Sequence, residues 1–330
     1  MKTFNSTCEK PLESSHWLPG ERMEKHTTHT ILMIEPVAFG FNEQTAVNNH
    51  FQQNDNAATL DIQSQALAEF NEMVSKLQAH NIEVIVVKDT IEPSTPDSIF
   101  PNNWISFHAS GRVALYPMYA QNRRDERRTD ILNLLTNKGF KVLDIVDYTP
   151  WEKANRFLEG TGSIILDRQH KIAYAAISER TDHAMFMQFC EDFNYHPVCF
   201  IANQTINGKR MPIYHTNVMM CVAEQYAVIC LDAIDVECKR KAVVDAIVKT
   251  GKKIIEITEA QMNCFAGNML QVENREGKQF LVMSQSAYNS LTKVQIDQLT
   301  SYNELITAAI PTIEKYGGGS VRCMMAEIFN

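Results

Sequence analysis

One pattern recurs along most of this chain: two short strand-like stretches, a helix-like stretch and a third, buried strand. A polar residue stands at the start of each recurrence. These residues are Asn103, Glu159, His215, Asn268 and Cys323, separated by 56, 56, 53 and 55 positions. A single unit of this size cannot bury its apolar face alone, so near-equal repeats predict units that pack on one another. We expect a closed ring of five units whose polar residues converge on a central channel; the simpler alternative is that strand starts are polar by chance.

The secondary structure expected within each unit follows from apolar spacing. The first hairpin is expected over residues 103–108 and 112–116, and helical spacing from Leu60 to Leu77 precedes a buried strand at 82–87. The other hairpins are expected at 163–167 with 172–176, 218–223 with 226–231, and 269–273 with 279–284. Alternating strands and helices predict an α/β protein, with ordered structure beginning at a strand over 30–35.

Composition and charge exclude several classes of protein. The 330 residues are 45% hydrophobic and 21% charged, with only 13 glycines and 11 prolines, which is typical of a globular chain rather than of collagen or a disordered protein. A net charge of −8 does not favour nucleic acid or an anionic membrane as partner. No apolar run approaches the ~20 residues that cross a bilayer. We therefore expect a cytoplasmic protein that binds a small molecule.

The first residues differ in composition from the rest. Residues 1–24 are mostly polar and lack the apolar stretch of a signal peptide. We expect them to form a mobile leader that precedes a single catalytic domain at 25–330.

The eight cysteines do not suggest a metal site, because no C-x-x-C or H-x-x-x-H pair occurs. Most are expected to be small core residues, and we expect neither a metal nor an organic cofactor. Cys323 is the exception. It follows Gly317-Gly318-Gly319-Ser320-Val321-Arg322, whose glycines let the backbone approach a ligand closely. A cation from Arg322 or a protonated His215 would favour the reactive thiolate.

Two further residues are candidates for proton transfer. His215 is expected to open an apolar strand, with Asn217 two residues later on the same face. Glu159 precedes Gly160 and Gly162. A cysteine, a histidine and a glutamate that converge can perform nucleophilic catalysis. A surface position for Glu159 and a purely structural role for His215 are the alternatives.

These motifs resemble those of the guanidine-modifying superfamily of pentein fold, which includes arginine deiminases, dimethylarginine hydrolases, amidinotransferases and succinylarginine dihydrolases. The resemblance covers most of residues 28–330. The run 317–324 is similar to the glycine-rich run that ends in the deiminases' nucleophilic cysteine, and 215–217 resembles their histidine-any-aspartate motif. Residues 158–162 resemble a glutamate-glycine-glycine-aspartate segment, with glycine in place of the aspartate. Residues 96–103 are similar to a dimethylarginine hydrolase segment that ends in a glutamate-aspartate pair.

The resemblance implies a fold and a set of roles. The fold would be a five-bladed α/β propeller of ββαβ repeats around a central channel. Cys323 would be the nucleophile, His215 would transfer protons, and Glu159 would serve the histidine or the substrate. A homodimer is also an expectation of the family.

Two departures from the family point to the substrate. Asn103 and Asn217 stand where deiminases place carboxylates that pair with a cationic guanidinium. An amide both donates and accepts hydrogen bonds, so it suits a neutral ureido group better. We therefore expect hydrolysis of a linear ureido C–N bond, citrulline giving ornithine, ammonia and carbon dioxide, as in the similar citrulline utilisation hydrolases. Asn268 and Arg322 are expected among the substrate ligands.

An amino-acid substrate also needs a cation for its carboxylate, and we nominate Arg124 and Arg156. Three alternatives stay open. The first is a guanidine hydrolase resembling arginine deiminase, dimethylarginine hydrolase or succinylarginine dihydrolase. The second is an amidinotransferase, which would need an amine acceptor. The third is a non-catalytic pentein that binds a macromolecule.

Overall fold

The computed structural model describes residues 24–55 and 59–329. Its strands form five three-stranded sheets and one two-stranded sheet. In each three-stranded sheet the first strand runs antiparallel to the second, and the third strand runs parallel to the second. A helix connects the second strand to the third each time. The predicted α/β class and the order strand, strand, helix, strand are therefore present in the fold.

Four of these units follow one another along the chain. The first consists of β3 (Ile105–Phe107), β4 (Arg112–Leu115), α3 (Thr129–Asn137) and β5 (Asp144–Asp147), and the second of β6 (Ile165–Asp167), β7 (Ile172–Ala176), α5 (His183–Asp192) and β8 (His196–Phe200). The third consists of β11 (Met220–Val222), β12 (Tyr226–Ile229), α6 (Glu237–Lys249) and β13 (Lys253–Glu256). The fourth consists of β14 (Leu270–Glu273), β15 (Gln279–Ser284), α8 (Gln285–Ser290), α9 (Lys293–Thr300) and β16 (Glu304–Ala308).

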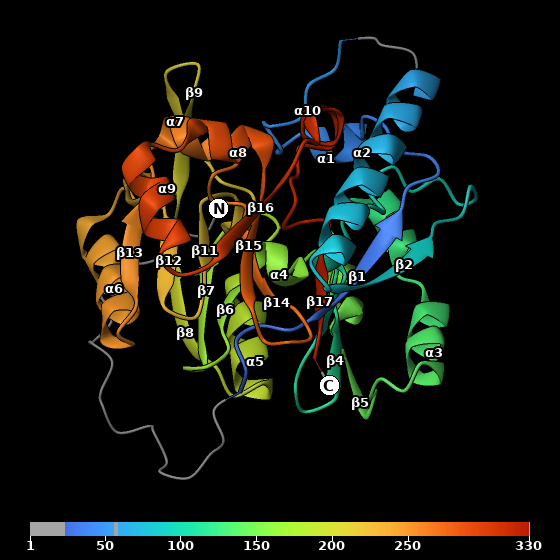
Figure 1. The fold of residues 1–330 in the computed structure, drawn as a ribbon, viewed down its shortest axis with the longest axis horizontal. Helices are drawn as coiled ribbons and strands as arrows, with labels where there is room; N and C mark the ends of the chain where they lie inside the picture. Colours follow the sequence, from blue (N-terminus) through green and yellow to red (C-terminus); the bar gives the residue numbers. More distant parts are fainter. Residues whose placement is uncertain (1–23, 56–58, 330) are drawn as a thin grey trace.

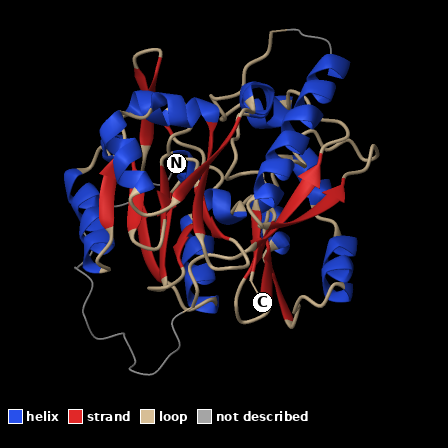
Figure 2. Ribbon diagram, in the orientation of Figure 1, coloured by secondary structure: helices blue, strands red, loops and turns tan. Residues whose placement is uncertain are grey.

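The fifth unit joins the two ends of the described chain. β17 (Ala326–Ile328) pairs antiparallel with β1 (Thr30–Glu35), and β1 pairs parallel with β2 (Glu83–Lys88) after α1 (Glu43–Ala46) and α2 (Thr59–Ala79). In this register Thr30 lies opposite Ile328. Figures 1 and 2 show the long helices α2, α3, α6 and α9 on the outside of the strands.

Short elements connect the units or lie between the second strand and the helix of a unit. They are η1 (Pro101–Asn103), η2 (Gln121–Glu126), η3 (Thr149–Ala154), α4 (Gly160–Ser163), β9 (Asn203–Ile206), β10 (Lys209–Pro212), η4 (Thr216–Val218), η5 (Leu231–Ala233), α7 (Glu259–Met262) and α10 (Pro311–Gly317). The hairpin of β9 and β10 is an insertion between the second and third units. Its turn places Asn207 and Gly208 at positive φ, as a tight hairpin turn requires.

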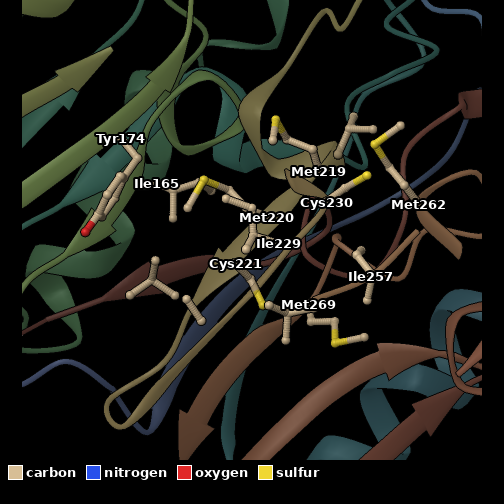
Figure 3. Close-up of a cluster of buried hydrophobic side chains, with 14 of the residues drawn as sticks. Ile165, Tyr174, Met219, Met220, Cys221, Ile229, Cys230, Ile257, Met262 and Met269 are labelled. Carbon is tan, nitrogen blue, oxygen red and sulfur yellow. The ribbon is translucent and has the colours of Figure 1, made fainter. Parts of the chain in front are cut away.

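The core consists of the apolar helix faces and buried strands that the spacing of apolar residues predicted. α2 buries Ile62, Ala66, Phe70 and Leu77 on one face, while all five residues of β7 are buried. One core cluster is rich in sulfur, and Figure 3 shows its members around β11 and β12. Its methionines and cysteines include Met219, Met220, Cys221, Cys230, Met262 and Met269. These cysteines pack as small apolar residues.

The strand starts differ from the prediction. β3, β6 and β11 begin at residues 105, 165 and 220, because each is preceded by a short helical turn. Asn103 ends η1, Glu159 precedes α4, and His215 precedes η4. His215 and Asn217 therefore do not share a strand face. α4 packs against both η1 and η4, so these turns bring polar residues of three units together.

Two sequence expectations concern the ends of the chain and membranes. The predicted leader at 1–24 lies outside the described residues except for Glu24. Within the described ranges, no helix combines the length and the hydropathy that crossing a bilayer requires.

Candidate active site

The five residues that mark the repeats lie in the turns before the first strands of the units, and most of them meet. Asn103, His215 and Cys323 line one cavity. Glu159 contacts His215, and Asn268 contacts Cys323. The sequence spacing thus identified residues that the fold brings to one place.

Cys323 is buried and is contacted by two amide groups. Its Sγ accepts hydrogen bonds from Nδ2 of Asn217 at 3.2 Å and from Nδ2 of Asn268 at 3.3 Å. The Asn268 amide is held in this orientation because its Oδ1 accepts the backbone N–H of Arg322 at 3.0 Å. N–H groups directed at the sulfur stabilise negative charge there. Asn268 is therefore a partner of the thiol, whereas the sequence predicted a substrate ligand.

Each glycine of the run before Cys323 allows a close approach. A side chain at Gly317 or Gly319 would lie 2.8 or 2.9 Å from the ring of Phe100. Gly318 has a φ of +62° and lies under Asn49, whose Nδ2 donates to the Gly318 carbonyl at 3.3 Å. The hydroxyl of Tyr214 donates to the same carbonyl at 2.7 Å. These contacts hold the glycine run in place at the edge of the cavity.

His215 and Glu159 form a buried pair. The His215 Nε2 atom lies 2.7 Å from Oε2 of Glu159, and Glu159 has no exposed surface. Burial lowers the pKa of His215 to about 4, and Arg180 and Arg123 add to this effect, although Glu159 opposes it. The imidazole is therefore neutral at pH 7. With Nε2–H directed at the carboxylate, the lone pair is on Nδ1.

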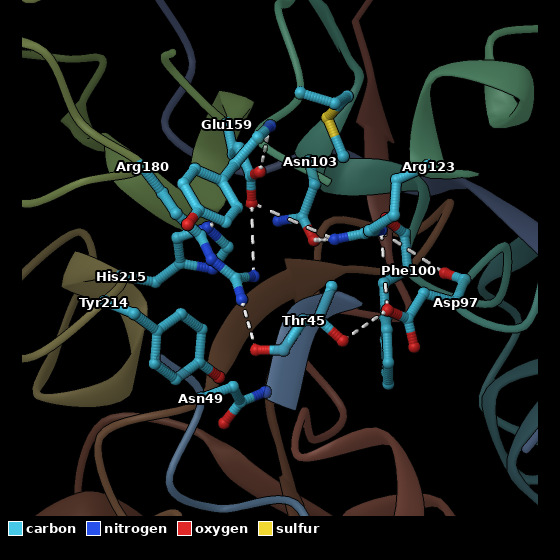
Figure 4. A network of polar contacts seen from close by, with 12 residues as sticks. Thr45, Asn49, Asp97, Phe100, Asn103, Arg123, Glu159, Arg180, Tyr214 and His215 are labelled. Atoms are coloured by element: carbon cyan, nitrogen blue, oxygen red, sulfur yellow. Dashed lines mark hydrogen bonds and ion pairs between the residues drawn. The ribbon is translucent and has the colours of Figure 1, made fainter. Parts of the chain in front are cut away.

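Two arginines keep Glu159 ionised. Nη1 of Arg180 lies 3.6 Å and Nη1 of Arg123 lies 3.9 Å from Oε2 of Glu159 (Figure 4). The backbone N–H of Tyr119 donates to Oε1 at 2.9 Å. Burial alone would raise the pKa of Glu159, but Arg180, the hydrogen bond with His215 and Arg123 outweigh it and hold the pKa well below its usual range.

Arg123 anchors one wall of the cavity. Its guanidinium makes a bidentate pair with Glu126 at 2.8 and 2.9 Å and donates to Oδ1 of Asn103 at 2.9 Å. Asp97 lies 3.7 Å from Arg123 and also lines the cavity. Burial raises the pKa of Asp97 despite this neighbour. Its Oδ1 has no hydrogen-bond partner among the described residues.

The cavity is narrow and only partly enclosed. Its volume is about 10 Å³, enough for about one water molecule. Thr45 and Asn49 close it on one side, and the Thr45 carbonyl accepts from Nη2 of Arg180 at 2.8 Å. Nε of Arg180 donates to Oδ1 of Asn48 at 2.9 Å. The segment that contains Thr45 and Asn48 therefore occupies hydrogen bonds that Arg180 would otherwise offer to the cavity.

Gly162 explains a departure from the family motif. A Cβ at this position would lie 2.4 Å from Nδ2 of Asn103 and 2.9 Å from Nδ1 of His215. No side chain, and so no aspartate, fits there without displacing both residues. Glycine at position 162 therefore leaves the room that the Asn103 amide occupies.

Two buried amide atoms of the site remain unpaired among the described residues. They are Nδ2 of Asn103, a donor, and Oδ1 of Asn217, an acceptor. The Asn103 amide is oriented because Arg123 occupies its oxygen, and the Asn217 amide is oriented by its bond to Cys323. A buried donor or acceptor without a partner costs free energy, so these atoms are suited to a ligand.

The nominated arginines lie elsewhere. Nε of Arg124 donates to the carbonyl of Met118, and Arg156 is 3.9 Å from Asp182 and half-buried. Arg322 turns away from the thiol, donating to Oε2 of Glu327 at 2.9 Å. None of the three lines the cavity.

Sequence reasoning missed Asp97, Arg123 and Arg180, which do line the cavity. Arg123 and Arg124 are adjacent in the sequence, so only the direction of the side chain decides which of them lines the cavity. Nothing in the described ranges groups three histidine, cysteine or carboxylate side chains as a metal site would.

Solved structures share this fold. ArgZ without ligand, an arginine dihydrolase from the ornithine–ammonia cycle in cyanobacteria, is 16% identical with a TM-score of 0.70, over 91% of this chain and 40% of that chain. The N-terminal domain of ArgZ, as a cysteine-to-serine mutant bound to substrate, has a TM-score of 0.67 at 16% identity, over 91% and 98% of the two chains. The chain thus spans about 40% of the length of full ArgZ.

A third solved structure has the same fold. The DDAH of Pseudomonas aeruginosa, a cysteine-to-serine mutant in complex with citrulline, is 14% identical with a TM-score of 0.62, over 92% of this chain and all of that chain. No curated protein matches the chain. The model of the family described as "N,N dimethylarginine dimethylhydrolase, eukaryotic" matches residues 35–330. The chain therefore belongs to this family, and with it to the guanidine-modifying pentein superfamily.

Proposed function

We propose that this protein is a cysteine hydrolase of a linear ureido C–N bond, and that it converts citrulline and water into ornithine, ammonia and carbon dioxide. The observation that carries the proposal is the pair of unpaired amide atoms, Nδ2 of Asn103 and Oδ1 of Asn217. A ureido group presents a carbonyl acceptor and N–H donors, which match them.

A guanidinium is a poorer match for this site. It carries N–H donors and no acceptor, so Nδ2 of Asn103 would remain unpaired. That nitrogen cannot be exchanged for the oxygen by turning the amide, because the oxygen accepts from Arg123. The neutral substrate therefore satisfies an atom that the cationic one leaves buried and unpaired.

The first half of the reaction forms a covalent bond. Neutral His215 takes the proton of the Cys323 thiol, and the sulfur attacks the ureido carbon. The C–N bond to one nitrogen breaks, and His215 returns the proton to the departing amine. Ionised Glu159 stabilises the imidazolium that forms in between. Asn217 and Asn268 stabilise the sulfur as an anion before attack and again when it leaves.

In the second half, His215 takes a proton from a water molecule that attacks the S-carbonyl carbon. The C–S bond breaks, and the sulfur leaves as a thiolate that takes the proton back from His215. The carbamate product then loses carbon dioxide and frees the second amine. A related covalent step is supported by the N-terminal domain of an ArgZ variant, which is covalently bound to a reaction intermediate.

The cavity also has groups for the amino-acid end of citrulline. We assign the α-carboxylate to Arg180, whose Nε and Nη2 now donate to Asn48 and to the Thr45 carbonyl. We assign the α-ammonium to Asp97, whose Oδ1 is unpaired. Because the cavity holds only about one water, the segment with Thr45 and Asn48 has to move for substrate to enter.

The proposal extends to the arrangement of the units. Residues 25–330 form one catalytic domain, a five-bladed propeller whose units surround the site. The contacts between β17 and β3, between β6 and β11, and between β11 and β14 support this arrangement, because they join first strands of neighbouring units.

A guanidine substrate is the second candidate, and the Asp97 carboxylate favours it. That group would pair with a guanidinium if the substrate lay in the opposite direction. The family model points to the same class. The two candidates differ in whether the cation lies at the reacting end or at the amino-acid end of the substrate.

Product analysis tests the proposal. Purified protein is incubated separately with citrulline, arginine and N,N-dimethylarginine, and ornithine, citrulline and ammonia are quantified, with Cys323→Ala as control. Ornithine from citrulline, absent with Cys323→Ala, is expected. Citrulline accumulating from arginine or from N,N-dimethylarginine would instead establish a guanidine hydrolase.

A further inference from the structure

A second hollow lies behind the wall of the reaction cavity. It has a volume of about 380 Å³, within the range of small-molecule sites, and is formed by β9 of the inserted hairpin, the end of α7, α8 and α10. Figure 1 shows these elements at one edge of the molecule. Phe51, Gln204, Phe265 and Glu314 are among its lining residues. None of the lining residues lines the reaction cavity.

Gln204 gives this hollow its chemical character. The side chain lines the hollow but is only 1% exposed. Neither its oxygen nor its nitrogen has a hydrogen-bond partner among the described residues. A buried amide left unpaired costs free energy, so a partner for both atoms would stabilise it. The matching group presents a donor and an acceptor side by side, as a carboxamide or a ureido group does.

The charged groups of the hollow are already paired. Glu314 accepts from the hydroxyls of Ser320 and Ser286, each at 2.7 Å. Lys315 forms an ion pair with Asp55. A charged ligand would have to break one of these pairs, whereas a neutral ligand leaves them intact.

Two aromatic rings provide an apolar surface. The rings of Phe51 and Phe265 lie 5.2 Å apart, tilted by 42°. Phe51 also contacts Tyr214, which lines the reaction cavity. A flat, apolar body fits against such rings.

We propose that this hollow is a second ligand site, for a small neutral molecule that presents a planar carboxamide or ureido edge to Gln204 and an apolar body to Phe51 and Phe265. The site is separate from the reaction cavity, although the two share a wall: Asn49 faces the cavity, while His50 and Phe51 face the hollow. The inference does not depend on which substrate the enzyme hydrolyses.

Binding measurements with matched probes test this site. Nicotinamide and N-butylurea are titrated by calorimetry into wild-type protein, Gln204→Met, Asn103→Ala and Gln188→Met. 3-Acetylpyridine serves as a control probe, because it keeps the ring and the carbonyl of nicotinamide but lacks the N–H donors. Binding of nicotinamide or N-butylurea distinguishes a carboxamide from a ureido ligand.

We expect at least one of the two probes to bind the wild type, and its Kd to rise about tenfold or more in Gln204→Met, because two buried hydrogen bonds are lost. Gln188 is exposed on α5, so Gln188→Met should bind as the wild type does. Asn103→Ala should also bind normally, because it alters the reaction cavity alone. 3-Acetylpyridine should bind more weakly than nicotinamide.

Three results would overturn the proposal. They are no binding of either probe, equal affinity in Gln204→Met, or loss of binding in Asn103→Ala, which would place the probe in the reaction cavity. Misfolding is not expected of Gln204→Met, since methionine has a similar volume and removes the unpaired atoms. The comparison of nicotinamide with 3-acetylpyridine uses wild-type protein, so it tests the hydrogen bonds to Gln204 even if Gln204→Met does not fold.

Discussion

His215 and Glu159 come from successive repeat units, 56 residues apart, and their side chains form a fully buried hydrogen bond of 2.7 Å between Nε2 and Oε2. The carboxylate fixes which ring nitrogen carries the proton and leaves Nδ1 as the base. Arg180 and Arg123 keep that carboxylate ionised. The pair therefore holds a neutral base ready at pH 7, and it also makes folding sensitive to acid.

Acid sensitivity is the first prediction. The pKa of His215 is lowered from 6.5 to about 4 in the folded protein, so the unfolded state binds the extra proton between these values. The free energy of unfolding should be highest above about pH 6.5 and should fall by about 2–3 kcal/mol towards pH 4.5. The depressed pKa of Glu159 adds a loss at still lower pH. Urea unfolding at pH 7.5 and 4.5 measures this.

A histidine variant isolates this effect. His215→Gln should lose less stability than the wild type over the same pH range, whereas His196→Gln, at an exposed site on β8, should follow the wild type. An identical pH dependence in His215→Gln and the wild type would show that His215 is not buried in its neutral form.

The second prediction concerns Gly162. In Gly162→Ala the added methyl group would overlap the Asn103 amide and the His215 ring, at 2.4 and 2.9 Å, so both should shift. We expect kcat/KM for citrulline to fall about 100-fold, because a displacement of about 1 Å of catalytic groups has that effect. Gly40→Ala, whose nearest contact would be 4.0 Å, is the matched control. Normal activity in Gly162→Ala would mean that Asn103 and His215 need not hold these positions.

The third prediction changes the charge at Asn103. Asn103→Asp keeps the acceptor for Arg123 but replaces the unpaired N–H group with an oxygen. Citrulline would lose a donor to its ureido oxygen and face a carboxylate, so kcat/KM for citrulline should fall about 100-fold or more. The ratio of kcat/KM for arginine to that for citrulline should rise. Asn133→Asp, exposed on α3, should change neither value, and an unchanged ratio in Asn103→Asp would remove this residue from substrate selection.

The fourth prediction tests which arginine binds the substrate carboxylate, Arg180 or one of Arg124 and Arg156. Arg180→Lys loses the forked geometry that binds a carboxylate, so KM for citrulline should rise about tenfold or more. The effect on KM should be absent for the analogue in which hydrogen replaces the α-carboxylate. Arg124→Lys and Arg156→Lys should leave KM unchanged, because neither residue lines the cavity. A larger effect in either of these variants than in Arg180→Lys would reverse the assignment.

Much of the fold could be predicted from sequence, because apolar spacing directly reflects burial in strands and helices. The strand at Thr30–Glu35 and the strand at Ile172–Ala176 have the predicted bounds. The starts of β3, β6 and β11 were predicted too early. The turns before them run directly into the apolar residues of the strands, and only packing between units determines that they are helical.

The site could be predicted only in part. Equal spacing identified Cys323, His215 and Glu159, because equivalent positions of repeats converge. Arg180 was missed because its partners Thr45 and Asn48 lie more than 130 residues away. The direction of the Arg322 guanidinium, towards Glu327 and away from the thiol, depends on a pairing in the core that no local pattern reveals.

The most direct test of the account is the intact mass of the enzyme, quenched with acid during turnover of citrulline. We predict an adduct on Cys323, with the mass of a carbamoyl group or of citrulline less ammonia, which also shows which amine leaves first. It should be absent from Cys323→Ala. An adduct formed from arginine and not from citrulline, or one attached to a different cysteine, would contradict the proposal that Cys323 attacks a ureido carbon.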